Sequence, residues 1–373
     1  MNNNKAIYFP GLNGLRAIAA LAVVLSHTTQ YFGDFGLDPY VFGKTYEGQP
    51  RGIELGAFGV SIFFTLSGFL ITYLLLKEKE SRSLNIKNFY FRRILRIWPL
   101  YYLNLALTLI TIYFWKMPFQ YNTLAFYVFL AANIPYILGF YFQLLIHYWS
   151  LGVEEQFYLF WPWFVKLQLK KLTKLIWVLI AGLLFLKIVF HLLRLRYQIS
   201  IPYLTLHVTR FHCMLFGCIG AILYYQRNKI FINLASHFLT QIICWTAILA
   251  LAINRFHFFS IIDNELVSLV GLCLIISQAQ GKNRIINLEN NIMDFLGKIS
   301  YGIYIFHLLI IFYFSKLFPK IKDIGFSSYV LVYLMVVITC VAVAWLSYQY
   351  FEKRFLRLKL RYSVVPSTSA KHF

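Results

Sequence analysis

The chain has 373 residues, of which 60% are hydrophobic and 13% charged, and its formal net charge is +21. Soluble domains carry about 25% charged residues, so this composition excludes a soluble globular protein and predicts an all-α polytopic membrane protein. The positive charge does not indicate nucleic-acid binding, because the basic residues lie in short clusters between apolar runs, as in cytoplasmic loops. The five cysteines fall within apolar runs and lack metal-ligand spacing, so we expect no metal site.

Ten apolar runs are long enough to cross a membrane. They cover residues 12–32, 56–76, 97–115, 148–165, 175–193, 206–225, 231–253, 263–280, 296–314 and 327–350. A further run, 123–142, is interrupted by Asn133, Pro135 and Gly139. If it does not span, most Lys and Arg side chains lie on one side of the membrane, whereas spanning would move four basic clusters to the other side.

The positive-inside rule therefore predicts about ten transmembrane helices with both termini cytoplasmic. Residues 117–147 are expected to form an outer re-entrant or interfacial element. Such backbone is tolerated at membrane depth only where it lines a cavity or is buried in protein. We expect one transmembrane domain over residues 1–361, followed by a disordered cytoplasmic tail over 362–373.

The first apolar run carries two ionisable residues, Arg16 and His27. In a helix, eleven residues correspond to about 16 Å and place both side chains on one face. A charge inside a membrane helix costs several kcal/mol, so such residues are expected to be functional. The alternative is a signal peptide or an ordinary anchor in which Arg16 snorkels and His27 has no role, although the weakly charged N-terminus argues against cleavage.

Two segments near the inner ends of the second and third runs are candidates for a binding site. The pair Ser67-Gly68 is small enough for close approach of a helix or a thin ligand, and helix packing is the simpler explanation. Before the third run, guanidinium groups could bind phosphate bidentately, or the cluster could set the topology and contact anionic membrane lipid. These arginines are Arg92, Arg93 and Arg96.

The fourth run contains two consecutive carboxylates, Glu154 and Glu155, which cannot both face lipid. Glu154 lies about as deep from the outer end as His27 does. A His–Glu pair of this kind is a standard general base with its orienting group. The alternative is a buried ion pair that only sets the helix register.

Later runs offer weaker candidates for substrate binding. Arg210, near the outer end of the sixth run, could snorkel or could hold an anionic sugar. In the ninth run, Ser300, Tyr304 and His307 recur along one stripe of a helix. This stripe indicates either a polar channel lining or a buried structural histidine.

Seven segments of the chain together resemble the acyltransferase 3 (OafA/YrhL-type) family of integral membrane acyltransferases. In chain order they are GLNGLRAIAALAVVLSH, FTLSGFLIT, FYFRRILRIWPLYY, HYWSLGVEEQFYLFWP, TRFHCMLFGCIGAIL, ISYGIYIFH and YFEKRF. They extend from Gly11 to Phe355, so the resemblance covers nearly the whole chain and follows the family's order.

The resemblance implies an enzyme that takes an acyl group, most often acetyl, from cytoplasmic acyl-CoA and places it on a glycan hydroxyl at the outer face. It implies that Arg16 and His27 form the catalytic signature with Glu154, and that the coenzyme contacts Arg92, Arg93 and Arg96. We therefore expect a bacterial inner-membrane O-acetyltransferase. Acetyl-CoA would be its co-substrate, with its arm passing Ser67-Gly68, and a surface polysaccharide or lipid-linked glycan would be its acceptor.

The sequence departs from the family pattern in two places. Asn13 stands where the family usually has an acidic residue, so any ion pair with Arg16 must be found elsewhere. Many members also carry an extra span and an extracytoplasmic esterase-like domain, whereas this chain ends about twenty residues after the last run. We expect either direct transfer or a separate esterase-like partner protein.

Two other functions are compatible with the sequence. A polytopic protein with ionisable residues in its apolar runs could be a transporter or flippase of a glycan or acyl donor, although no internal repeat is visible. Alternatively, an O-acyltransferase of this kind could act on a small molecule, or could use succinyl-CoA as its donor.

Overall fold

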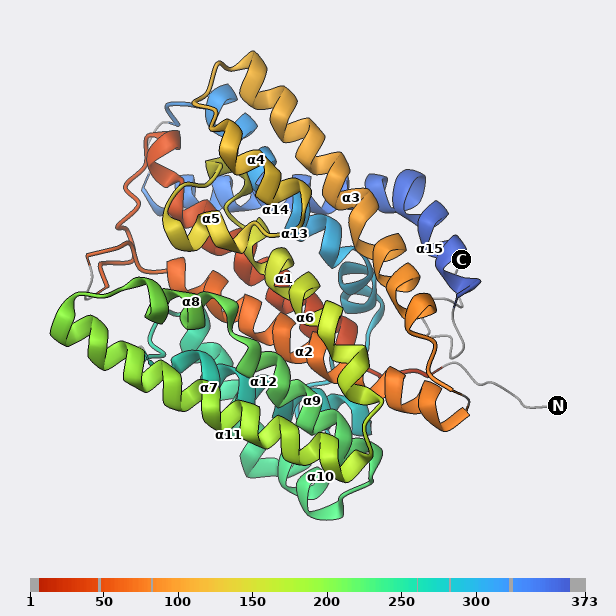
Figure 1. The fold of residues 1–373 in the computed structure, drawn as a ribbon. Coiled ribbons are helices and arrows are strands. Elements are labelled where there is room, and N and C mark those ends of the chain that lie inside the picture. The colour runs from red at the N-terminus through yellow and green to blue at the C-terminus, as the bar shows by residue number, and fades with distance from the viewer. Residues whose placement is uncertain are drawn as a thin grey trace.

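The computed structural model describes residues 7–45, 48–81, 83–259, 261–281, 283–321 and 325–362. These residues form a bundle of helices with α1 (Leu12–Gln30) and α2 (Ile53–Ser81) near its middle (Figure 1). Within this part of the chain, extended pairing is limited to one antiparallel bridge between Lys44 and Pro50. The all-α class predicted from the composition is confirmed.

The other helical elements follow with short connections. They are η1 (Phe32–Phe35), α3 (Ile86–Phe114), α4 (Tyr121–Val128), α5 (Asn133–Leu138), η2 (Gln143–Leu145), α6 (Tyr148–Val165), α7 (Leu169–Tyr197), α8 (Ile201–Thr209), α9 (Phe211–Tyr225), α10 (Lys229–Ser236), α11 (Phe238–Ala252), α12 (Asp263–Gln280), α13 (Asn291–Leu317), α14 (Phe326–Ser347), η3 (Tyr348–Glu352) and α15 (Lys353–Leu360). Arg210 alone separates α8 from α9, and η3 is a π-helical turn that joins α14 to α15.

Six stretches are long and apolar enough to cross a membrane, namely α2, α3, α7, α8–α9, α13 and α14–α15. The pair α10–α11, bent by 54°, makes a seventh if it counts as one span. Three more helices, α1, α6 and α12, coincide with predicted spans but have 19, 18 and 18 residues and carry ionisable side chains. The chain is a multi-pass membrane protein, while the number ten and the cytoplasmic termini stay predictions. Residues 363–373 of the predicted tail lie outside the described residues.

Residues 117–147 do not form a membrane-crossing helix. They fold into the short helices α4 and α5 and the turn η2, as the interrupted run predicted. The hydroxyl groups of Tyr101 and Tyr102 donate to the carbonyl oxygens of Tyr127 and Val128 at the end of α4, each at 2.8 Å. Side chains of α3 therefore bond to backbone carbonyl oxygens that would be hydrogen-bonded within the helix if this segment crossed the membrane.

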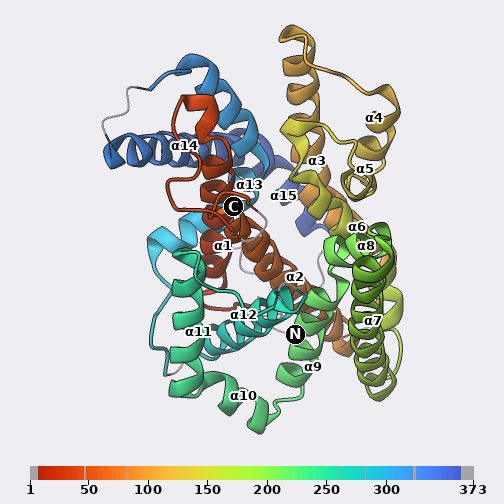
Figure 2. The same cartoon turned by 90° about the vertical axis from the view of Figure 1, so that its left-hand side faces the viewer.

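The centre of the bundle depends on close contact between α2 and α9. A Cβ atom at Gly68 would overlap the backbone of Met214, and one at Gly217 would overlap the backbone of Thr65. Small residues allow such close approach of two helices in a membrane. α2 also contacts α1, α6 and α12, and α13 contacts α1, α3 and α14, whereas α7 lies at the edge of the bundle (Figure 2).

We expect Gly68→Ala to destabilise the protein by about 1–3 kcal/mol, because the added methyl group must displace the backbone of Met214. Gly182→Ala in α7 is the matched control, since nothing lies within 4 Å of its Cβ position and alanine favours the helix by about 1 kcal/mol. Thermal unfolding of both purified variants beside the wild type measures the difference. Equal melting temperatures for Gly68→Ala and the wild type would contradict the close packing of α2 and α9.

Candidate active site

A cavity lies between α1, α2, α3, α6 and α13, and its empty volume, including the part open to solvent, is about 800 Å³. Its wall combines apolar side chains with hydroxyl, carboxylate and guanidinium groups. The cavity brings together a set of residues that the sequence analysis singled out separately: Arg16, Ser67, Arg93, Arg96, Glu154, Ser300 and Tyr304. Side chains from both halves of the chain thus meet in one space.

Arginines form the basic end of this cavity. Arg93 and Arg96 lie one turn apart on α3, and Arg16 comes from α1. The Arg93 guanidinium lies over the Tyr158 ring, 5.5 Å from its centroid. No carboxylate among the described residues lies within ion-pair distance of these three side chains. Partly buried cations that form no direct ion pair are costly, so this end of the cavity is suited to bind an anion such as a phosphate.

The ion pair expected for Arg16 is replaced by a relay through Asn13. Arg16 Nη1 donates to Asn13 Oδ1 at 3.1 Å, and Asn13 Nδ2 donates to Asp294 Oδ1 at 2.6 Å. The other carboxylate oxygen of Asp294 pairs with Lys298 Nζ, also at 2.6 Å. The neutral amide therefore orients the guanidinium without cancelling its charge.

Glu154 lies in the cavity wall but is not the partner of His27. Ser67 Oγ donates to Glu154 Oε1 at 2.6 Å, while Trp98 Nε1 donates to the neighbouring Glu155 Oε2 at 3.0 Å. The predicted His27–Glu154 pair is therefore corrected. Equal depth along two helices does not define how each helix is rotated about its axis, and Glu154 is turned toward α2.

His27 pairs with His307 of α13 instead. His27 Nδ1 and His307 Nε2 lie 2.9 Å apart, and the two rings are stacked with 4.9 Å between centroids. His307 Nδ1 lies 2.6 Å from the carbonyl oxygen of Tyr304, whose side chain lines the cavity. His307 itself is 0% exposed, which agrees with the alternative of a buried structural histidine, and its role in contacting substrate stays a prediction.

Arg92 and Gly68 lie outside the cavity. Arg92 Nη2 forms a salt bridge with Glu78 Oε2 at 2.7 Å, and its Nη1 donates to the carbonyl oxygen of Tyr362 at 2.8 Å. The guanidinium connects α3 to α2 and to the residues after α15, and its role in coenzyme binding stays a prediction. Gly68 packs against α9, which was the alternative considered for the small residues.

Arg210 also lies elsewhere, at the break between α8 and α9, where its φ is 44°. Its Nε donates to the carbonyl oxygen of His207 at 2.8 Å, and its Nη1 donates to the carbonyl oxygen of Ala57 and to Ser61 Oγ. The side chain is buried and bonded within the protein, and its role in holding a sugar stays a prediction. These bonds connect the break between α8 and α9 to α2.

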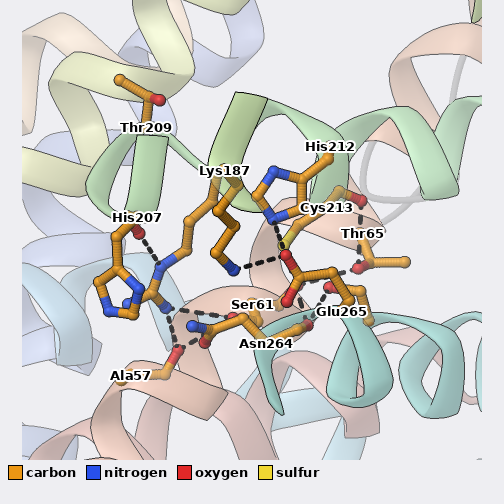
Figure 3. Close-up of polar contacts among 12 residues, drawn as sticks. Ala57, Ser61, Thr65, Lys187, His207, Thr209, His212, Cys213, Asn264 and Glu265 are labelled. Carbon is orange, nitrogen blue, oxygen red and sulfur yellow. Dashed lines mark hydrogen bonds and ion pairs between the residues drawn. The ribbon is translucent and has the colours of Figure 1, made fainter. Parts of the chain in front are cut away.

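Figure 3 shows a buried ion triad formed by Lys187, His212 and Glu265. Lys187 Nζ and His212 Nε2 lie 2.6 Å and 3.0 Å from the same oxygen, Glu265 Oε1. The three residues come from α7, α9 and α12, and all are buried. Because removing one member leaves a buried charge without its partner, the triad couples the packing of these three helices.

Some residues of this region were not predicted from the sequence. Ser150 and Tyr158 line the cavity with Glu154, and their spacing of four residues on either side of it places all three on one helix face. That spacing could have identified Ser150 and Tyr158 from the sequence. His147, whose ring centroid lies 4.8 Å from that of His307, carried no comparable signal. In the described part of the chain, no group of three or more His, Cys, Asp or Glu side chains could hold a metal ion.

Comparison with known proteins identifies the family. The profile of the family described as "Acyltransferase domain" (Acyl_transf_3) matches residues 9–349. "Putative O-acetyltransferase SAR0937" of Staphylococcus aureus (strain MRSA252) is 27% identical over 397 aligned residues, covering 97% of this chain and 60% of that protein. "Peptidoglycan O-acetyltransferase OatA" of Listeria monocytogenes is 34% identical over 190 residues, covering 47% of this chain and 27% of that protein. No solved structure matches.

The chain spans about 60% of the length of the first of these relatives. The residues matched by the family profile include every element that lines the cavity, from α1 to α13. The motifs in the sequence, the cavity that they form and the family match agree. The chain belongs to the acyltransferase 3 family.

Proposed function

We propose that the protein is an acyl-CoA-dependent O-acetyltransferase of the bacterial inner membrane. Its acceptor is a hydroxyl group of a cell-surface or exported polysaccharide, or of the lipid-linked precursor of that polysaccharide. The observation that carries this proposal is the cavity in which three guanidinium groups share a wall with hydroxyl-bearing side chains, among them Tyr304, whose backbone carbonyl oxygen bonds to the His307 ring of the histidine pair. His27 itself is not among the residues that line this cavity. The names of the relatives in the comparison support the transfer of acetyl groups to oxygen.

The basic end of the cavity fits the phosphates of a coenzyme. Arg16, Arg93 and Arg96 present several N–H donors, and guanidinium groups bind phosphate oxygens in pairs of hydrogen bonds. Beyond them the wall consists of apolar side chains with Ser67 and Glu154, which suits a thin, largely neutral pantetheine arm. We assign the arginines to binding and Ser67 to the path of the arm.

His27 is the general base of the proposed reaction. It removes the proton from the acceptor hydroxyl while the hydroxyl oxygen forms a bond to the thioester carbonyl carbon. The carbon–sulfur bond then breaks, and the sulfur leaving group takes the proton from His27. Free CoA and the acetyl ester are the products, and the neutral histidine is restored. The acyl group passes to the acceptor directly or through a separate extracytoplasmic esterase-like partner.

The function is tested with purified protein in nanodiscs that receive radiolabelled acetyl-CoA together with bacterial glycan freed of its esters by mild alkali. We expect release of free CoA and label in the glycan that mild alkali removes again. Succinyl-CoA in place of acetyl-CoA tests the donor. Without CoA release from either donor, the proposal fails, and movement of glycan across vesicles would then favour the transporter alternative.

We expect Arg96→Ala to weaken acetyl-CoA binding roughly 10- to 100-fold, because one charge-assisted contact contributes about 1.5–3 kcal/mol. Arg92→Ala is the matched control on the same helix. Its guanidinium already forms a salt bridge with Glu78, so this variant should lose thermal stability and keep its affinity. Isothermal titration with acetyl-CoA measures both variants. Equal loss of affinity in the two would contradict the assignment of phosphate binding to the cavity arginines.

A further inference from the structure

The pair of His27 and His307 allows the position of each ring proton to be worked out. His307 Nδ1 lies 2.6 Å from the carbonyl oxygen of Tyr304. A carbonyl oxygen only accepts hydrogen bonds, so His307 Nδ1 carries a proton and donates it. In a neutral imidazole the second nitrogen then has a lone pair and accepts, so His307 Nε2 is an acceptor.

The neutral state of His307 follows from its surroundings. The ring is 0% exposed, and no carboxylate among the described residues lies within ion-pair distance of it. The groups packed around it include two other imidazole rings, the ring of Tyr304 and the backbone carbonyl of Tyr304. A positive charge placed there would be buried without a partner, which is costly.

The bond between the two histidines therefore has one direction. His307 Nε2 accepts, so His27 Nδ1, 2.9 Å away, must donate its proton. The remaining nitrogen of His27, Nε2, then carries the lone pair. His27 is also partly exposed as a residue, whereas His147 and His307 are 1% and 0% exposed.

We propose that His307 is the positioning residue of His27. Through its bond to Nδ1 it holds the neutral His27 ring in the tautomer whose Nε2 accepts a proton, and Tyr304 O fixes His307 in turn. When the acceptor hydroxyl loses its proton to Nε2, His27 becomes doubly protonated and its Nδ1–H bond to His307 is kept. This inference rests on the proposed function of His27 as the general base.

Two substitutions at one position test the role of the acceptor atom. His307→Leu removes it and should lower kcat about 100-fold with an unchanged KM for acetyl-CoA. In His307→Gln, the side-chain amide oxygen can accept the bond from His27 Nδ1, so kcat should recover to within about tenfold of the wild type. Equal losses in the leucine and glutamine variants would overturn the proposal.

His147→Leu is the matched control for the loss of a buried imidazole. This ring packs against His307 and bonds through Nε2 to the carbonyl oxygen of Ile305, at 3.1 Å, without a contact to His27 Nδ1. We expect its kcat to stay within about tenfold of the wild type. A loss as large as that of His307→Leu would mean that any missing ring disturbs the site, and would overturn the positioning role.

A measurement independent of activity separates this inference from the proposed function. In nanodiscs containing protein labelled with 15N-histidine, NMR distinguishes protonated from unprotonated ring nitrogens, and His27→Ala assigns the signals of His27. We expect a protonated Nδ1 and an unprotonated Nε2 in the wild type at neutral pH, and a mixture of tautomers in His307→Leu. A proton on Nε2 in the wild type would overturn the inference even if acetyl transfer is observed. The expected tautomer in a protein that transfers no acetyl group would support the geometry and reject the function.

Discussion

Replacing His27 with alanine is expected to lower kcat for acetyl transfer about 10²- to 10⁴-fold, the usual contribution of a positioned general base. The affinity for acetyl-CoA should stay the same, because the arginines that we assign to phosphate binding come from α1 and α3 and none of them contacts His27 among the bonds of the described residues. Release of free CoA in the presence of glycan measures the rate, and titration calorimetry measures the binding.

Gln30→Ala is the control for a change on the same helix, since Gln30 is exposed at the end of α1. It should keep both the rate and the affinity of the wild type. Unchanged acetyl transfer in His27→Ala would remove this residue from the chemistry and, with it, the mechanism proposed above. A loss of acetyl-CoA binding together with the rate would instead place His27 in the donor site.

Replacing Glu265 with alanine is expected to destabilise the folded protein by about 3–5 kcal/mol, the usual cost of breaking a buried ion pair. Lys187 Nζ and His212 Nε2 both lose their acidic partner, and neither residue is more than 2% exposed. Glu265→Gln should have a smaller effect, because it keeps an oxygen that accepts hydrogen bonds while losing the charge. Thermal unfolding of the three proteins in one detergent measures the order.

The exposed pair Lys77–Glu80 is the control for the buried triad. Its ions are 2.8 Å apart, but the side chains are 33% and 54% exposed. Glu80→Ala should therefore change the stability by less than about 1 kcal/mol. If Glu265→Ala were as mild as Glu80→Ala, Lys187 and His212 would not depend on the buried carboxylate.

The sequence identifies best those residues whose charged side chains cost free energy in a membrane, because an apolar run around a charge can be recognised without a structure. Arg16, Arg93 and Arg96 lie in or beside apolar runs, where a guanidinium group without a role would be selected against. Ser67 and Tyr304 carry no charge, and only the motifs around them indicated a role. All five line one cavity, whereas His27, Arg92 and Gly68 do not, so local sequence predicted only part of the cavity wall.

The pairing of residues within the site was not predictable in this way. His27 and His307 are 280 residues apart, and their contact depends on how α1 and α13 are rotated against each other. Counting residues gives the depth of a side chain along its helix, which placed Glu154 near His27. The rotation of each helix about its own axis depends instead on how the helices pack. Here the packing turns Glu154 toward Ser67.

The charged residues that stabilise the fold and those of the site look alike in the sequence. Arg92 and Arg96 are one helical turn apart, yet one forms a salt bridge with Glu78 and the other lines the cavity. Arg210 lies in an apolar run as Arg16 does, but it donates to backbone carbonyl oxygens at a helix break. The structural arginines are distinguished from the cavity arginines only by the positions of their partners, Glu78 and Ala57, in the folded protein.

The relay from Arg16 through Asn13 to Asp294 has a consequence for turnover. A carboxylate in direct contact would offset the charge of Arg16, whereas the carboxamide of Asn13 leaves that charge directed at whatever enters the cavity. Under the proposed function, a spent coenzyme would carry the same phosphates as the incoming one and would be held with the same strength after the ester has formed. We therefore expect departure of the product to limit the rate in this chain, and added salt to speed the steady state while weakening capture of the donor.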